Sequence, residues 1–300
     1  MNFTCQNCGA ALTVDGDLRT TVCAFCAAPS VVERPGAEGV RPTFTLGFVQ
    51  PKAAVEQRVA KWLRSQSVFC PGSLRRAKVE AIQGVYLPAY LYSAVARSAY
   101  TAEIGERYTV TETYTTTENG QTVEHTRTRT ETEWQGLSGE HAANVVDVLV
   151  TASQGLSNEE LQAVEPFDYR ALRRYSPAMN SGWLAEDPSM GHAQSLALAR
   201  TEALRKTTDV LQRFLPGDTH RGLQHDTRLE QEELSLIQVP VWLLNARYQK
   251  DKPPVRIVVN GQTGALHGKP PRSWRRIAAA VLGVLATLAL VWWIAGGGLR

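Results

Sequence analysis

Catalytic motifs are missing from this chain of 300 residues. Its six histidines are scattered, without the HExxH pair of a metalloprotease, and no serine lies in the Gly-x-Ser-x-Gly turn of a hydrolase. The glycines of residues 260–264 (NGQTG) lack the lysine that follows them in a phosphate-binding loop, so we expect a plain turn there. We therefore predict a protein that is not an enzyme, while an enzyme of an unrecognised type stays an alternative.

A large excess of charge is missing as well, because 32 lysines and arginines face 29 aspartates and glutamates. The net charge of +3 is accounted for by four basic residues near the C-terminus: Lys269, Arg272, Arg275 and Arg276. Residues 1–30 contain one basic residue, Arg19, beside Asp15 and Asp17. Nucleic-acid binding gains affinity when basic side chains release counterions, so this segment is poorly suited to it. Nucleic-acid binding is therefore kept only as the alternative function.

Four cysteines are the strongest chemical signal that the chain does contain. The pair Cys5 and Cys8 is separated by 14 residues from the pair Cys23 and Cys26. This spacing is typical of a structural Zn²⁺ site in which two knuckles, each on a β-hairpin, supply four thiolates. A closed shell of four ligands leaves no position for a substrate, so the predicted zinc would stabilise the fold and not catalyse. Disulfides or incidental thiols are the alternative, and Cys70 is expected to be an ordinary thiol.

Near the other end, residues 277–294 form a run of 18 residues without a charge. At 1.5 Å per residue such a helix crosses most of a bilayer core of about 30 Å. Trp274 lies before the run and Trp292 and Trp293 near its end, where aromatic rings prefer the lipid headgroups. We expect a single transmembrane helix in the lipid bilayer; a buried core helix is the alternative.

The predicted orientation and the predicted metal site agree with one another. The basic residues before the apolar run favour a cytoplasmic location for residues 1 to about 276. Thiolate ligands persist best in such a reducing compartment. The first residues, MNFTC, contain neither a basic stretch nor an apolar run, so we expect no signal peptide. The expected location is the cell membrane, with a single pass and a cytoplasmic N-terminus.

The order of helix, strands, helices and strands between these ends favours an α+β fold with a mixed helix and antiparallel-sheet domain. The predicted parts are a zinc ribbon at 1–32, a linker at 33–50, a cytosolic α+β domain at 51–272, a transmembrane helix at 273–295 and a short tail at 296–300. No internal repeat or low-complexity tract interrupts this order.

Several elements of the central domain have clear local signals. After Pro51, the apolar residues Val55, Val59, Trp62 and Leu63 are spaced so that they lie on one face of a helix. Ser157 and Glu160 have the spacing of a capping box at the start of a short helix. Asp187 and Pro188 are suited to begin a long helix that ends near Leu215, before Pro216 and Gly217. Strands are expected at residues 85–92, 145–150, 234–249 and 255–260.

Threonine-rich residues 109–133 predict a β-hairpin, because they contain Asn119-Gly120, the pair that a type I′ turn favours. That turn places Tyr114 opposite His125. Both faces of the hairpin are polar, so we expect it to project into solvent, with contact to a partner as the alternative.

A second metal site is a weaker hypothesis. His220 and His225 lie five residues apart, near Asp218 and Asp226, and could bind a metal ion. A polar loop is the preferred interpretation of this segment.

Seven segments together carry a resemblance to a known family: GVYLPAYLYSA at 84–94, DVLVTASQGL at 147–156, VEPFDYRAL at 164–172, WLAED at 183–187, VPVWLL at 239–244, VNGQTGALHGKPPRSW at 259–274 and the terminal apolar run. With the four cysteines in front, the chain resembles bacterial membrane-anchored proteins that carry a transcription-factor-IIB-type zinc ribbon.

Some relatives in that family look like components of phage-shock-type membrane-stress systems that act beside flotillin-like (SPFH) proteins. The resemblance therefore implies a non-enzymatic adaptor with protein partners at the membrane. It carries over four functional positions: Cys5, Cys8, Cys23 and Cys26.

Overall fold

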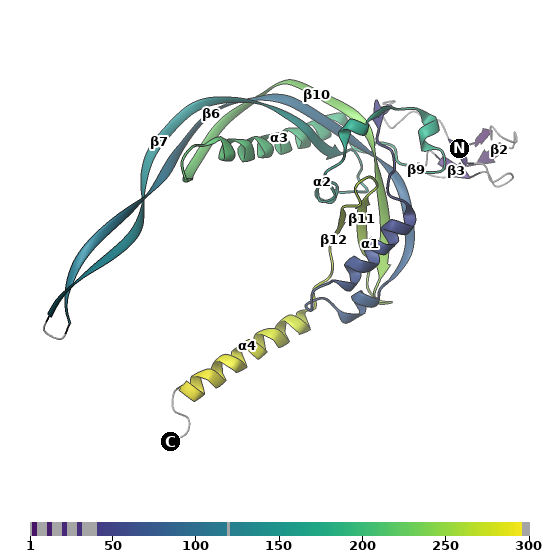
Figure 1. Ribbon diagram of the computed structural model, residues 1–300. Coiled ribbons are helices and arrows are strands. Elements are labelled where there is room, and N and C mark those ends of the chain that lie inside the picture. The colour runs from purple at the N-terminus through teal and green to yellow at the C-terminus, as the bar shows by residue number, and fades with distance from the viewer. Residues whose placement is uncertain are drawn as a thin grey trace. The chain divides into compact units, whose positions relative to one another are not determined.

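The computed structural model describes residues 2–4, 11–13, 20–22, 29–31, 41–118 and 121–295 (Figure 1). The chain divides into two compact units. Unit 1 comprises Met1–Tyr90, Val150–Gly191 and Ser235–Arg300, and unit 2 comprises Leu91–Leu149 and His192–Leu234.

Two short antiparallel strand pairs lie at the front of the chain. Strand β1 (Asn2–Thr4) pairs antiparallel with β2 (Ala11–Thr13), and β3 (Thr20–Val22) pairs antiparallel with β4 (Pro29–Val31). Each predicted cysteine pair lies in the sequence between two paired strands. The cysteines themselves, Cys5, Cys8, Cys23 and Cys26, lie outside the described residues, so the zinc site stays a prediction.

The other described strands form a mixed sheet of eight: β5 (Phe44–Thr45), β6 (Lys78–Glu118), β7 (Gln121–Thr151), β8 (Arg173–Arg174), β9 (Leu184–Ala185), β10 (Thr219–Arg247), β11 (Val255–Asn260) and β12 (Leu266–Gly268). Its order is β12-β11-β10-β5-β8, and β6 pairs with β7, β9 and β10. The pairs β5–β10 and β6–β9 are parallel, whereas β10–β11, β11–β12 and β5–β8 are antiparallel. The α+β fold class is confirmed, with a sheet that is not purely antiparallel.

Helix α1 (Lys52–Arg64) covers the sheet of unit 1 as its spacing predicts. Val55, Val59 and Leu63 are buried, and they pack in one cluster with Trp242 and Ile257 of β10 and β11. Because these three residues are four apart, they lie on one side of the helix. Three short 3₁₀ helices also belong to this unit: η1 (Gly72–Arg76), η2 (Tyr169–Ala171) and η3 (Pro177–Asn180).

The last residues of the predicted linker, 33–50, take part in the sheet. Strand β5 adds to the sheet through parallel pairing with β10, and Thr43 N donates to Leu236 O at 2.7 Å. Leu46 is completely buried. The last residues of the range 33–50 therefore belong to unit 1, because their alternating apolar side chains reach its core; residues 33–40 lie outside the described part.

Residues 260–264 form a structural turn, as predicted. The Asn260 side chain is buried, and its Oδ1 accepts hydrogen bonds from the backbone N–H of Gln262 (2.8 Å) and Thr263 (3.1 Å). Its Nδ2 donates to the carbonyls of Val164 (2.9 Å) and Pro166 (3.1 Å). One asparagine thus bonds the backbone of both this turn and the loop after α2 (Asn158–Gln162).

The predicted capping box between Ser157 and Glu160 is present at the start of α2.

In unit 2, β6 ends at Glu118 and β7 begins at Gln121, so the predicted turn residues Asn119 and Gly120 fall in the gap between the described strands. The rings of Tyr114 and His125 stack at a centroid distance of 5.6 Å, which confirms the predicted pairing. The separate strand predicted at 145–150 is instead the last part of β7, whose 31 residues run on without a break.

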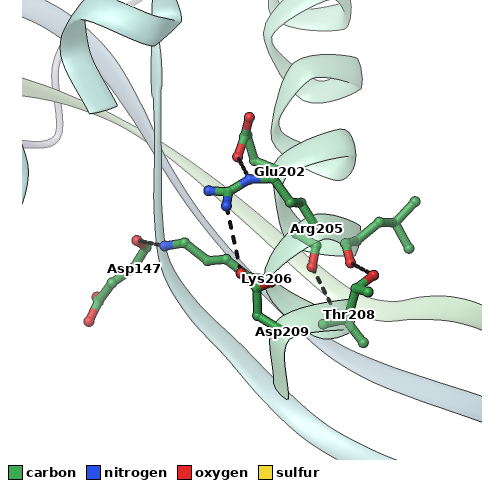
Figure 2. Close-up of polar contacts among 9 residues, drawn as sticks. Asp147, Glu202, Arg205, Lys206, Thr208 and Asp209 are labelled. Atoms are coloured by element: carbon green, nitrogen blue, oxygen red, sulfur yellow. Dashed lines mark hydrogen bonds and ion pairs between the residues drawn. The ribbon is translucent and has the colours of Figure 1, made fainter. Parts of the chain in front are cut away.

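Helix α3 (His192–Phe214) runs beside the long strands in Figure 1 and buries mostly small side chains within unit 2. The buried residues are spaced by four: Ser195, Ala199, Ala203, Thr207 and Leu211. A later part of the helix contacts β7, where Lys206 Nζ donates to the carbonyl of Asp147 at 2.7 Å (Figure 2). Asp147 has the left-handed φ of 57° that aspartate tolerates better than most residues.

The start predicted for this helix is wrong, and its end is correct. Ser189 N and Met190 N both donate to the carbonyl of Ala152, at 2.9 and 3.0 Å, so the segment after Pro188 follows β7 before helical bonding begins at His192. After Phe214, Pro216 has no backbone N–H to continue the helix, and Gly217 adopts a φ of 87°, which glycine reaches without steric cost.

Candidate membrane-proximal site

Helix α4 (Trp274–Ala295) contains a 20-residue stretch, Trp274–Trp293, that is long and apolar enough to cross a membrane. None of this stretch is buried inside the protein. At 1.5 Å per residue, 20 residues measure about 30 Å, the thickness of a bilayer core. The absence of burial argues against the alternative of a core helix.

The first turn of α4 is tied to the loop that follows α1. Ser273 N donates to the carbonyl of Phe69 at 2.7 Å, and Arg276 Nη1 donates to the carbonyl of Val68 at 3.0 Å. The same guanidinium lies over Gly72, where an added Cβ atom would meet Arg276 Nη2 at 2.9 Å. The helix therefore begins against the folded part of unit 1 and not at the end of a free linker.

The loop itself, residues 65–72, is held by hydrogen bonds on both sides. Gln66 Nε2 donates to the carbonyl of Trp62 at 2.7 Å, and Arg75 donates from Nε and Nη2 to the carbonyl of Gln66 at 3.2 and 2.9 Å. Cys70 is buried, as expected of an ordinary thiol. Between these anchors Val68 is 61% and Phe69 42% exposed.

A cavity of about 490 Å³ opens between the loop and the first turn of α4. Phe69, Cys70, Pro270 and Ile277 give it an apolar lining, and Gln66, Ser67 and Arg272 contribute polar groups. Sequence reasoning did not find this cavity. The available signal was the apolar pair Val68-Phe69 in the short polar segment between α1 and η1.

The four basic residues predicted to set the orientation have different contacts. Lys269 Nζ pairs with Glu159 Oε2 at 3.1 Å, and Arg276 holds the loop. Arg272 and Arg275 are exposed and have no hydrogen-bond or ion-pair partner among the described residues. Their charges are therefore available to groups outside the protein.

The second hypothesised metal site is not assembled in the described part of the chain. His220 and His225 lie in strand β10 and not in the predicted polar loop. The ring of His225 is engaged by two hydroxyls, Thr208 Oγ1 at Nε2 and Thr227 Oγ1 at Nδ1, each at 2.8 Å. No group of three His, Cys, Asp or Glu side chains that could hold a metal occurs in the residues that the structure describes.

Unit 2 contains a polar triad that the sequence did not reveal. Tyr92 OH donates to Glu232 Oε2 at 2.8 Å, and Arg200 donates from Nε and Nη2 to the same carboxylate at 2.7 and 2.8 Å. The hydrogen bond from Arg200 lowers the pKa of Glu232, while burial raises the pKa of Tyr92 and the contact with Glu232 raises it further. This arrangement fixes α3 on the sheet and keeps the tyrosine neutral, so it serves structure.

The fold and the site define an α+β protein with one C-terminal apolar helix that could cross a membrane. The chain is similar to the uncharacterized protein YdjG of Bacillus subtilis (strain 168), with 23% identity over 263 residues. The similarity covers 86% of this chain and 73% of that protein. No protein-family model and no solved structure matches the chain.

Proposed function

We propose that this chain is a membrane-tethered adaptor that does not catalyse a reaction and that recruits proteins to the cytoplasmic face of the cell membrane. The observation that carries the proposal is helix α4, which is apolar, unburied and hydrogen-bonded at its base to a folded unit. An anchor attached in this way would hold the α+β domain close to the lipid surface.

We further infer that the front of the chain is a zinc ribbon of the transcription-factor-IIB type. Its support is that two antiparallel strand pairs frame the sequence positions of the two Cys-x-x-Cys pairs. Four thiolates would bind one structural Zn²⁺ and give the adaptor a small rigid module. By the resemblance of the chain, flotillin-like or phage-shock-type proteins are the proposed partners, and membrane stress is the proposed setting.

The orientation proposed for the anchor follows from its flanking charge. Arg272, Arg275 and Arg276 precede the charge-free run of residues 277–294 without an intervening acidic residue. Basic residues beside a transmembrane helix are retained on the cytoplasmic side. A reporter that works only in the cytoplasm should therefore be active before Met1 and inactive after Arg300, and the reverse result would overturn this orientation.

Zinc binding is tested on the full-length protein purified in detergent under reducing conditions. We expect about one zinc ion per chain, lost on alkylation of the thiols, because only deprotonated sulfur binds the metal. Cys23→Ser should lose the metal, and Cys70→Ser, the matched control, should keep it. Zinc-free wild-type protein prepared with zinc present would overturn the ribbon.

Recruitment is tested by crosslinking in native membranes, comparing wild-type protein with Cys23→Ser. The adaptor function predicts that proteins crosslinked to the wild type are lost from the variant while both stay in the membrane fraction. Identical crosslinks from both would contradict a recruiting ribbon. Submicromolar, salt-sensitive DNA binding would favour the alternative, a membrane-tethered nucleic-acid-binding protein.

A further inference from the structure

We propose that the loop of residues 65–72 and the first turn of α4 form a binding site for an anionic phospholipid. The acyl chain would lie against Phe69 and Ile277, and the phosphate would meet Arg272. The proposal rests on the proposed function, because it requires α4 to cross the bilayer. It adds to that function a specific lipid contact made by the folded domain.

The depth of the loop follows from its hydrogen bonds to the helix. Trp274 opens α4 and is 79% exposed, and tryptophan at the end of a transmembrane helix prefers the headgroup region. The carbonyl of Phe69 accepts from Ser273, the residue before this tryptophan, and the carbonyl of Val68 accepts from Arg276, two residues after it. The exposed side chains of Val68 and Phe69 therefore lie near the level of the headgroups.

Exposed apolar side chains at this place are consistent with a lipid surface. Among the described residues before α4, Val68 and Phe69 are consecutive and both exposed. Hydrogen bonds to the carbonyls of Gln66, Val68 and Phe69 hold the backbone of their loop. In water this arrangement leaves apolar area unburied, whereas acyl chains would cover it.

The polar lining of the cavity suits a phosphodiester. Arg272 has no partner among the described residues and carries a planar guanidinium, which binds phosphate oxygens in a bidentate manner. Ser67 Oγ accepts a hydrogen bond from Phe69 N at 3.3 Å, so its own hydrogen remains available for donation. A cationic and a neutral donor thus flank an apolar cavity of about 490 Å³, large enough for part of a lipid and not for the whole molecule.

The local charge favours an anionic lipid. Arg272 adds a positive charge at the cavity that has no partner among the described residues, and Arg275 adds another in the first turn of α4. Arg276 adds a third, whose hydrogen bond goes to a neutral carbonyl. Juxtamembrane basic side chains attract anionic lipids in the cytoplasmic leaflet and lose that attraction as salt rises. Of the four basic residues 269, 272, 275 and 276, Lys269 is the one that pairs with an acidic side chain of the described residues, Glu159.

The test places a photocrosslinker in the loop of the full-length chain. Phe69→p-benzoylphenylalanine is reconstituted in nanodiscs of phosphatidylcholine, with and without phosphatidylglycerol, and irradiated. We expect phospholipid adducts at position 69 by mass spectrometry, enriched about fivefold in phosphatidylglycerol over its share of the disc. The matched control is Val49→p-benzoylphenylalanine, which is 68% exposed in the same unit but away from the loop, and should give no adduct.

Substitutions of Arg272 provide a second test, of the phosphate contact. Arg272→Gln should abolish the phosphatidylglycerol enrichment and keep the adduct, and Arg272→Lys should restore part of the enrichment. Soluble glycerol phosphate in excess should not compete; competition would show a site for free phosphate and overturn the lipid assignment. No adduct at position 69, or equal adducts from both lipids, would also overturn it.

Failure of the proposed membrane anchor would give a different result from failure of the lipid site. If α4 does not cross the bilayer, the full-length chain will not enter nanodiscs and will remain in the soluble fraction. If the chain enters the discs but position 69 does not crosslink, the anchor stands and only the lipid site is wrong.

Discussion

Strand β6 shows the contrast between the two units along a single element. In unit 1, residues 85–90 are buried at every position, so both faces of the strand are covered. In unit 2, residues 96–102 alternate between buried and exposed, so one face is covered and the other open. Successive side chains of a strand point to opposite faces, which makes burial a direct readout of the layers on each side.

The covered faces also differ in what they contain. Unit 1 packs large rings together: Phe48 stacks on Trp183 at 3.9 Å, and both meet Trp242 edge to face. Unit 2 receives the small residues of α3, and Ser98 meets Thr227 through their hydroxyls at 2.7 Å. Unit 1 therefore depends on filled volume, while unit 2 depends on close approach and on individual polar contacts.

The largest effect should come from removing volume in unit 1. Ile257 is fully buried in the cluster under α1, and Ile257→Ala should lower the free energy of unfolding by about 3 kcal/mol. Chemical denaturation of the full-length protein in detergent measures this change. Leu204→Ala, at a 37% exposed position of α3, is the matched deletion and should cost about 1 kcal/mol or less. Equal losses at the two sites would show that burial under α1 is not what makes Ile257 important for stability.

A smaller loss is expected when unit 2 is overfilled. Ala203 lies at the centre of the buried stripe of α3 with no exposed area, so Ala203→Leu must push the helix from the strands at a cost of about 2 kcal/mol. Hydrogen exchange should accelerate in α3 and in the unit 2 part of β10, with unit 1 amides unchanged. The exposed Ala197→Leu on the same helix is the control, and comparable acceleration there would show that α3 is not packed through its small residues.

The difference between apolar packing in unit 1 and polar contacts in unit 2 also explains which elements could be predicted from the sequence. The face of α1 was predicted because Val55, Val59 and Leu63 are apolar and buried at helical spacing. The first half of β10 was missed although its residues 223–230 alternate regularly in exposure. Its half-buried residues include His225 and Thr227, whose burial is stabilised by hydroxyl contacts that no apolar pattern announces.

Tertiary contacts account for the other misses. Asp187-Pro188 has the local chemistry of a helix start, yet the carbonyl of Ala152 holds the next two backbone N–H groups and delays α3. The triad of Tyr92, Arg200 and Glu232 joins positions up to 140 residues apart, and two of its members look like ordinary surface charges in the sequence. Long-range polar partners of this kind are fixed by the fold and have no local signature.

The polar character of unit 2 should appear as a dependence of stability on pH. Because Arg200 lowers the pKa of Glu232, the folded state holds this proton less tightly than the unfolded state. The stabilisation is complete above the unfolded pKa of about 4.3 and is lost as pH falls through the lowered folded value. Glu232→Gln should cost about 1 kcal/mol near pH 7, where the ion pair is removed but Tyr92 can still donate, and progressively less below pH 4.

Thermal unfolding of wild type and Glu232→Gln at several pH values measures this difference. Glu230→Gln is the control, because Glu230 pairs with the exposed Arg97 and not with a buried tyrosine. A difference between wild type and Glu232→Gln that stays constant down to pH 3 would show that the carboxylate charge is not what holds α3.

The smallest effect is expected in the hairpin, where β6 and β7 carry polar side chains on both faces. Arg129 pairs with Glu112 at 3.2 Å and with Glu131 at 2.5 Å, but its side chain is 53% exposed and that of Glu112 is 49% exposed. Solvent screens such pairs, so Arg129→Ala should change the free energy of unfolding by less than about 0.5 kcal/mol. Double substitution with Glu112→Ala tests whether the two charges couple at all, and raising the salt concentration should remove what coupling there is. A loss of several kcal/mol would mean that the hairpin is part of the cooperative core of unit 2. The hairpin could then no longer be distinguished from the packed regions as an outer ribbon stabilised by backbone pairing.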